Sequence, residues 1–178
     1  MARRLLSLLF VACACGAAAV TVSSARAQKT VPIAHIPAIP AVGSIGPRCP
    51  IPQRYRAAFV TAARETRLPL ALLTAVAQVE SEFRADAVSS AGAKGLLQVM
   101  PTTARELALD AAHPTENVLA GARYLRRQFD AFPSSDLALA AYNAGPTAVA
   151  EAGGAPSVET VAYVVEVTSV WRSLAGCA

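Results

Sequence analysis

Apolar and polar residues alternate with helical spacing along most of the chain after Gln53. A first helix is predicted to end near Thr66, and a second covers about 70–81, where almost every position is apolar. A helix that is apolar on all sides is typical of a buried position. Further helices are predicted to start at Pro101, to run through 118–129 and 136–142, and to cover about 158–174. Gly145-Pro146 predicts a helix end. No strand pattern is present, so the sequence predicts an all-α fold.

The first residues have the pattern of a secretory signal peptide. A basic pair at 3–4 precedes an apolar run over 5–22, and Ala25-Arg26-Ala27 provides small residues for cleavage before Gln28. We expect residues 1–27 to be removed on export, which would place the protein in the periplasm or outside the cell, at the wall. An uncleaved membrane anchor is one alternative. A lipoprotein is another, because two cysteines lie in the apolar run: Cys13 and Cys15.

A proline-rich segment follows the predicted leader. Its prolines keep the chain extended and deny it regular hydrogen bonds. They are Pro32, Pro37, Pro40, Pro47, Pro50 and Pro52. We interpret residues 28–50 as a linker, or as an arm lying on the domain surface, and residues 51–175 as one domain.

The charge of the chain gives no support to nucleic-acid or membrane binding, and its histidines give none to a metal site. The whole chain has a formal charge of +4, but three of its 16 basic residues and none of its 12 acidic ones lie in the leader. The remaining 13 basic and 12 acidic residues give +1, so the basic pI argues for neither nucleic-acid nor membrane binding. His35 and His113 are isolated, and no cluster has metal-ligand spacing. We expect no metal and no cofactor.

Two cysteines remain after the leader, Cys49 and Cys177, near the two ends of the mature chain. In an exported protein such a pair can form a disulfide. Two free or partner-linked thiols are the alternative.

Glu80 stands out chemically because it ends the most apolar helix of the chain. Burial disfavours its charged form, and the negative end of the helix dipole acts in the same direction, so both raise its pKa. A carboxylic acid that stays protonated near neutral pH can donate a proton to a glycosidic oxygen. The alternative is an ordinary solvated glutamate. Glu159 begins a helix, where the dipole favours ionisation, so Glu80 is the better acid.

Three motifs occur in the order found in a known family. They are Glu80-Ser81, Gly95-Leu96-Leu97-Gln98-Val99-Met100-Pro101 and Ala141-Tyr142-Asn143-Ala144-Gly145-Pro146. In these the chain resembles the soluble lytic transglycosylase family, over nearly all of residues 51–175. The resemblance implies a single lysozyme-like helical domain with the fold of goose lysozyme.

The resemblance also implies roles for individual residues. Glu80 matches the single catalytic acid/base. The substrate-binding positions that it implies are Ser81, Ser89, Gln98, Met100, Tyr142, Asn143, Glu159 and Tyr163. Gln98 and Asn143 each offer a donor and an acceptor, which suits acetamido and hydroxyl groups. Taken alone, Gln98 could instead satisfy backbone groups, Met100 could fill the core, and Tyr142 could be a core ring.

The resemblance implies cleavage of peptidoglycan glycan strands after N-acetylmuramic acid, with formation of a 1,6-anhydro sugar and no consumption of water. A lysozyme-type hydrolase and a non-catalytic glycan-binding or assembly protein are the alternatives. We expect a monomer. Wall turnover is one expected role, and local opening of the wall for a secretion, pilus or conjugation apparatus is another.

Overall fold

The computed structural model describes residues 48–178. The predicted signal peptide, residues 1–27, and all but the last residues of the predicted linker, 28–50, lie outside the described residues. No helix within residues 48–178 combines the length and the apolar character needed to cross a bilayer.

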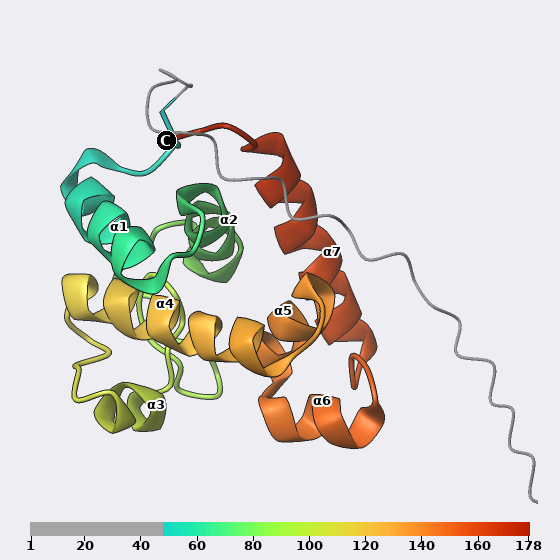
Figure 1. Ribbon diagram of the computed structural model, residues 1–178. Helices are drawn as coiled ribbons and strands as arrows, with labels where there is room; N and C mark the ends of the chain where they lie inside the picture. The colour runs from blue at the N-terminus through green and yellow to red at the C-terminus, as the bar shows by residue number, and fades with distance from the viewer. Residues whose placement is uncertain (1–47) are drawn as a thin grey trace, which may run out of the picture. The chain divides into compact units, whose positions relative to one another are not determined.

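Seven helices lie in residues 48–178, and two isolated β-bridges are the extended pairings there. The helices are α1 (Gln53–Thr66), α2 (Leu70–Ser81), α3 (Pro101–Glu106), α4 (Pro114–Ala131), α5 (Ser135–Ala144), α6 (Pro146–Ala152) and α7 (Val158–Ser173). The predicted all-α class is confirmed. Figure 1 shows α2 between α1 and α7, with α4 and α5 running across one end of this group.

Helix α2 forms the centre of the core, as its apolar sequence predicts. Residues Ala71 to Ala77 are all buried, and Leu72, Leu73 and Val76 have no exposed surface. The helix packs against α7 on one side and α1 on the other. It ends because Glu82 adopts a left-handed conformation, with φ of 52°, which a helix cannot continue. Glu80 therefore lies in the last turn of the helix, where it is partly buried.

The segment after α5 differs from the prediction. Gly145-Pro146 does end α5, but a further helix, α6, begins at Pro146 and was not predicted. Gly145 has φ of 89°, which glycine adopts without strain and which turns the chain sharply. Proline suits the first position of a helix, so the same pair stops one helix and starts the next.

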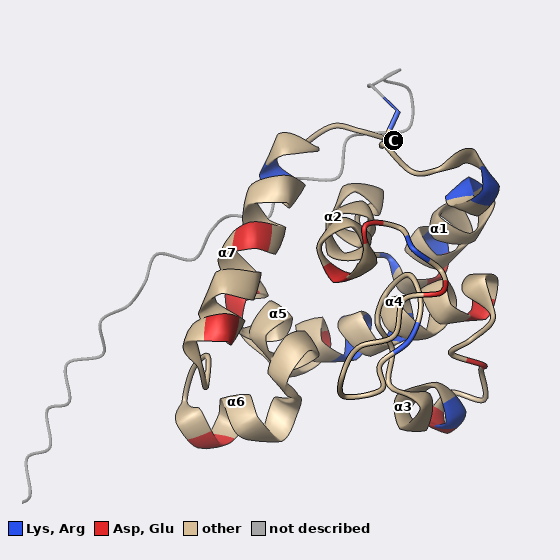
Figure 2. Ribbon diagram, turned by 180° about the vertical axis from the view of Figure 1, so that it is seen from behind, with Lys and Arg blue, Asp and Glu red and all other residues tan. Residues whose placement is uncertain are grey.

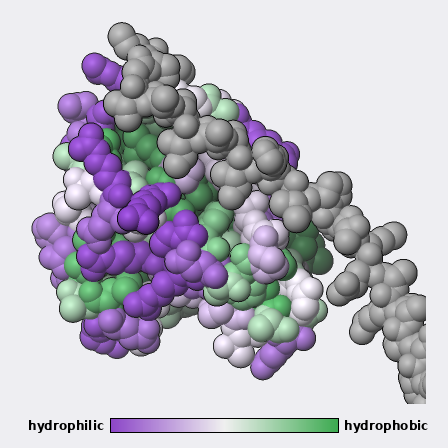
Figure 3. Space-filling view, in the orientation of Figure 1, coloured by the Kyte–Doolittle hydropathy of each residue, from purple (hydrophilic) through white to green (hydrophobic). Residues whose placement is uncertain are grey.

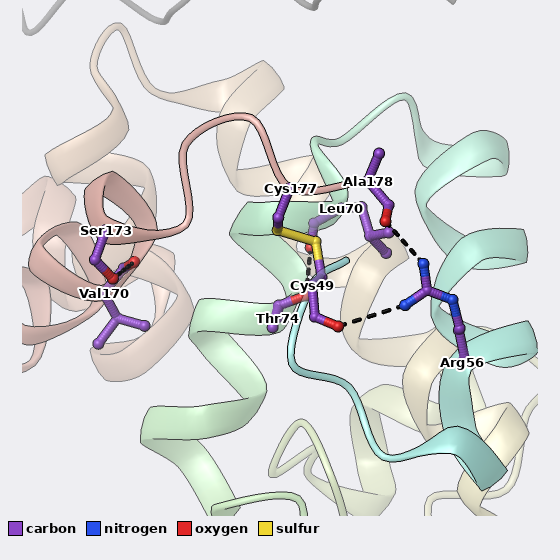
Figure 4. Close-up of a disulfide and its surroundings, with 8 residues drawn as sticks. All are labelled: Cys49, Arg56, Leu70, Thr74, Val170, Ser173, Cys177 and Ala178. Atoms are coloured by element: carbon purple, nitrogen blue, oxygen red, sulfur yellow. Dashed lines mark hydrogen bonds between the residues drawn. A yellow bond between two sulfur atoms is a disulfide. The ribbon is translucent and has the colours of Figure 1, made fainter. Parts of the chain in front are cut away.

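A disulfide joins the two ends of the described chain. Cys49 is bonded to Cys177, with the two Cα atoms 4.8 Å apart (Figure 4). Arg56 of α1 binds both chain segments that the bridge joins. Its guanidinium donates to the carbonyl oxygen of Cys49 at 3.4 Å and to that of Ala178 at 2.7 Å. The bridge and the arginine together fix the C-terminal segment after α7 against α1.

Charged residues are unevenly distributed over the helices. Most arginines of the helical domain lie on α1 and α4, whereas two glutamates and one arginine lie on α7 (Figure 2). Two arginines of α4 form ion pairs: Arg123 with Glu65 of α1, and Arg126 with Asp130 within the helix.

Candidate active site

The loop between α2 and α3, residues 82–100, is held in place by the buried side chain of Asn117 on α4. The Asn117 amide nitrogen donates to the carbonyl oxygens of Lys94 at 2.7 Å and Ala111 at 2.8 Å. Its oxygen accepts from the backbone N–H of Leu97 at 2.9 Å. Asn117 has no exposed surface. Its bonds give the Leu97 N–H and the Ala111 carbonyl oxygen their partner, and they add a second donor to the Lys94 carbonyl oxygen, which also accepts from Val99. One side chain thus fixes the loop that carries much of the site.

Two glycines allow the loop to lie this close to α4. A Cβ atom at Gly95 would come within 2.6 Å of the Asn117 side chain, and one at Gly121 within 2.5 Å of Leu97. Gly95 also has φ of 74°, which favours glycine. Gly95 of the loop and Gly121 of α4 therefore both serve the packing of the loop on α4.

A groove of about 400 Å³ lies along this loop, and Glu80 lines it. Its lining comes from α2, the 82–100 loop, α3, α4 and α5. The residues are Glu80, Ser89, Ala91, Ala93, Gln98, Val99, Met100, Thr103, Tyr124, Tyr142, Asn143, Ala144 and Gly145. Glu80 is the one carboxylate among them.

Glu80 has the electrostatic character predicted for it. Its burial raises its pKa from 4.5 to about 7, and the neighbouring Tyr163 hydroxyl lowers it to a smaller extent. At neutral pH the carboxyl is therefore divided between its acid and its ionised form. A group with this pKa can donate a proton and then take one back, which is what a single acid/base requires.

Two tyrosines enclose the Glu80 carboxyl. Tyr142 lies at the floor of the groove, and its hydroxyl donates to the carbonyl oxygen of Leu97 at 2.7 Å. Tyr163 of α7 is buried with its hydroxyl beside the Glu80 carboxyl, with which it interacts, and this hydroxyl has no other hydrogen-bond partner within residues 48–178. Burial raises the pKa of both phenols, and the Glu80 charge adds to this effect. Both therefore remain neutral, and the Tyr163 hydroxyl can donate to the Glu80 carboxyl.

Ser81 does not line the groove. It is buried at the end of α2, where its hydroxyl donates to the carbonyl oxygen of Leu96 at 2.8 Å. This bond joins the helix that carries Glu80 to the loop that forms the groove. Its position fits support of the acid and leaves it out of reach of a bound sugar.

Gln98 and Ser89 both line the groove and also hold the loop together. The Gln98 amide nitrogen donates to the carbonyl oxygens of Gly95 at 2.9 Å and Ala87 at 3.2 Å. The Ser89 hydroxyl accepts from the backbone N–H of Ala93 at 3.0 Å. The Gln98 oxygen and the Ser89 proton remain for a ligand. Met100 is 39% exposed at the groove, so core filling does not explain it.

Asn143 faces the groove from the end of α5 and is tied to α7. Its side-chain oxygen accepts from the Thr160 hydroxyl at 3.1 Å, which leaves the amide N–H groups free. Glu159, next to Thr160, is fully exposed and lies outside the groove lining. Its own backbone N–H and the Ser157 hydroxyl lower its pKa, as its place at a helix start predicts.

Six of the nine predicted residues meet at one groove: Glu80, Ser89, Gln98, Met100, Tyr142 and Asn143. The sequence did not predict Thr103 and Tyr124, which also line it. The Tyr124 ring packs against that of Tyr142, with centroids 5.4 Å apart. Tyr124 lies inside the stretch 120–125 that the resemblance covers, and its aromatic ring with a hydroxyl was the available signal.

The polar and aromatic side chains of the groove suit a sugar. It offers one carboxyl, amides, hydroxyls and tyrosine rings, which together can bind hydroxyl and acetamido groups and protonate an oxygen. Within residues 48–178 no group of three or more His, Cys, Asp or Glu side chains has the arrangement of a metal site.

Known proteins resemble part of this chain. A "Transglycosylase" of Enterobacteria phage PRD1 is 40% identical over 75 residues, which are 42% of this chain and 28% of that protein. The "Membrane-bound lytic murein transglycosylase F" of Maricaulis maris (strain MCS10) is 37% identical over 100 residues, which are 52% of this chain and 22% of that protein.

Two solved structures share the fold. The lytic transglycosylase Slt of Pseudomonas aeruginosa, solved as an inactive mutant, is 30% identical with a TM-score of 0.61, over 71% of this chain and 25% of that one. The 70-kDa soluble lytic transglycosylase of Escherichia coli is 26% identical with a TM-score of 0.59, over the same shares of the two chains. The present chain thus spans about a quarter of the length of these relatives. A family model described as "Transglycosylase SLT domain" matches residues 57–160, more than half of the chain. The chain belongs to the transglycosylase SLT domain family.

Proposed function

We propose that this protein is a peptidoglycan lytic transglycosylase with Glu80 as its single acid/base. The observation that carries the proposal is one carboxyl, alone in a sugar-sized groove, whose pKa burial raises to about 7. The names of the relatives, murein and lytic transglycosylases, agree with this activity. Glycosidases that attack with water or a nucleophile use two carboxylates, and Glu80 has no second one in the groove.

The reaction proceeds with one proton shuttled by Glu80. The acid form donates its proton to the glycosidic oxygen between N-acetylmuramic acid and the next sugar, and the C1–O bond breaks. The substrate's own 2-acetamido group stabilises the positive charge on C1. The Glu80 carboxylate then takes the proton of the 6-hydroxyl as that oxygen bonds to C1. The 1,6-anhydro product forms, and Glu80 is again protonated.

The tyrosines and amides position this chemistry. Tyr142 and Tyr124 present ring faces to a sugar, and the free groups of Gln98 and Asn143 bind its polar substituents. The Tyr163 hydroxyl is available to donate to the Glu80 carboxylate that forms after proton transfer. Glu159 is exposed and lies outside the groove lining, where an ionised side chain suits a peptide stem or a distal sugar.

We also propose a cellular setting for the enzyme. Residues 1–27 act as a signal peptide and residues 28–50 as the segment before the catalytic domain, 51–175. The exported enzyme acts as a monomer on glycan strands in the periplasm or at the wall. A secretion, pilus or conjugation apparatus is a candidate partner for such a small enzyme.

The test is product analysis with purified residues 28–178 and isolated peptidoglycan. Mass spectrometry should find muropeptides one water lighter than hydrated ones, absent with Glu80→Gln and present with Glu82→Gln. Glu82 is the matched control because it is an exposed glutamate two residues away. Hydrated ends that depend on Glu80 would identify a hydrolase. No release by the wild type, where a control enzyme works, would favour a binding protein.

A further inference from the structure

A second groove, of about 660 Å³, lies between α1, the start of α2 and the segment after α7. Its floor is apolar and includes Val60, Ala63, Leu68, Leu70 and Trp171, and three arginines of the α1 region stand at its edge. Figure 3 shows this apolar surface beside hydrophilic residues on the α1 side. None of its lining residues belongs to the Glu80 groove. The size lies within the range of about 300–1,000 Å³ that ligand pockets have.

The described chain begins at the edge of this groove. Cys49 is bonded to Cys177, which lines the groove, and their Cα atoms are 4.8 Å apart. The residues before Arg48 therefore start beside it. Val42 lies six positions before Arg48, and an extended chain of that length spans up to roughly 20 Å. The segment just before residue 48 is therefore long enough to reach into the groove.

The sequence of that segment has a regular apolar pattern. Ile33, Ile36, Ile39 and Val42 recur at every third position, and no Lys, Arg, Asp or Glu occurs from 33 to 47. A polyproline II helix has three residues per turn, so these four side chains would share one face. Pro37 and Pro40 favour that conformation. The other two faces carry prolines and small residues, apart from His35.

We propose that residues 33–47, called the arm, form a polyproline II helix that lays its isoleucine face into this groove. Proline-rich helices bind grooves that contain aromatic rings, and Trp171 supplies one. A polyproline II backbone has no internal hydrogen bonds, so its carbonyl oxygens can accept from Arg64 and Arg67 at the groove edge. The disulfide tethers the arm beside its site, which raises its effective concentration there above that of any free partner.

Trp171 reports on this contact because it is the one tryptophan of the chain and lines the groove. The experiment uses the chain from Gln28 onward, which retains every described residue. With Ile36→Ser and Ile39→Ser combined, Trp171 emission should shift to longer wavelength and acrylamide should quench it more strongly. Ala38→Ser with Ala41→Ser, on another face of the arm, should leave both unchanged.

A composition-matched variant tests the register. Ile36→Ala, Ala38→Ile, Ile39→Ala and Ala41→Ile together keep every residue type but move two isoleucines to another face. This variant should behave like the serine variant of the isoleucine face. Wild-type behaviour would contradict the three-residue register, and an unchanged Trp171 in the serine variant would overturn the proposal altogether. Protection of Trp171 that grows with protein concentration, together with a dimer by light scattering, would show that the arm binds a second copy and would refute the intramolecular contact.

Discussion

Replacing Glu80 by glutamine should stabilise the folded protein at alkaline pH and have little effect at acidic pH. Glutamine has nearly the shape of the protonated acid but cannot ionise. The buried position that raises the pKa of Glu80 to about 7 makes the ionised form costly in the folded state. The variant has no carboxyl to ionise there, so the difference in the free energy of unfolding between the two proteins should depend on pH.

The magnitude follows from the pKa values of the two states. The unfolded chain ionises Glu80 near 4.5, and the folded chain near 7. Below 4.5 both states hold the proton, and the native interactions contribute fully. Between 4.5 and 7 the unfolded state releases its proton first, so stability falls as pH rises, and above 7 the loss is complete. At about 1.4 kcal/mol per pKa unit, the total loss is about 3 kcal/mol.

Urea unfolding of the wild type and of Glu80→Gln, with the disulfide intact, measures this difference at several pH values. The free energy of unfolding of the variant minus that of the wild type should rise by about 3 kcal/mol between pH 4 and pH 8. This corresponds to roughly 6–12 °C in Tm. Glu82→Gln removes an exposed glutamate two residues away and is the matched control.

Parallel curves for the wild type and Glu80→Gln across this range would refute the reasoning. They would mean that Glu80 ionises in the folded protein as it does in the unfolded one. Burial would then not hold the acid in its protonated form, and the chemical role derived from it would lose its physical basis.

Three further predictions concern the surroundings of the acid and the ends of the domain. Tyr163→Phe removes the hydroxyl that lowers the pKa of Glu80, so the alkaline limb of the pH–activity profile should move to higher pH; a limb that stays or moves down contradicts this. Asn117→Ala leaves the Leu97 N–H and the Ala111 carbonyl oxygen without their partner and should cost about 2–4 kcal/mol of unfolding free energy. An unchanged urea midpoint would show that the loop does not depend on Asn117. Reducing the bridge between Cys49 and Cys177, which are 128 residues apart, should cost up to about 4–5 kcal/mol, and equal urea midpoints with and without reductant would contradict it.

Helix positions were predictable where the pattern is local and periodic. The apolar run over 70–81 identifies a buried helix, and the structure places α2 at the core. The raised pKa of Glu80 was predictable for the same reason, because it depends on the residues that precede it. Helix α6 was missed because Gly145-Pro146 serves both as a stop and as a start, and a stop signal alone does not indicate whether another helix begins.

Contacts between distant segments could not be predicted from the residues themselves. The hydroxyl of Tyr142 binds the carbonyl oxygen of Leu97, 45 positions earlier, and the role of Asn117 depends on a loop about 20 positions away. No local pattern specifies such partners. Tyr124 lies outside the series Val118, Ala122, Leu125 and Phe129 that marks its helix in the sequence, and it lines the groove because residues of α2, α5 and the 82–100 loop lie around it.

The central claim is that Glu80 directs the substrate's own 6-hydroxyl, and not water, to the reacting carbon. Digestion of peptidoglycan in water labelled with oxygen-18 tests this most directly, with mass spectrometry of the new muramic acid ends. We predict anhydro ends without the isotope from the wild type and no new ends from Glu80→Gln. Ends that carry oxygen-18 would show that water is the nucleophile and would contradict the claim.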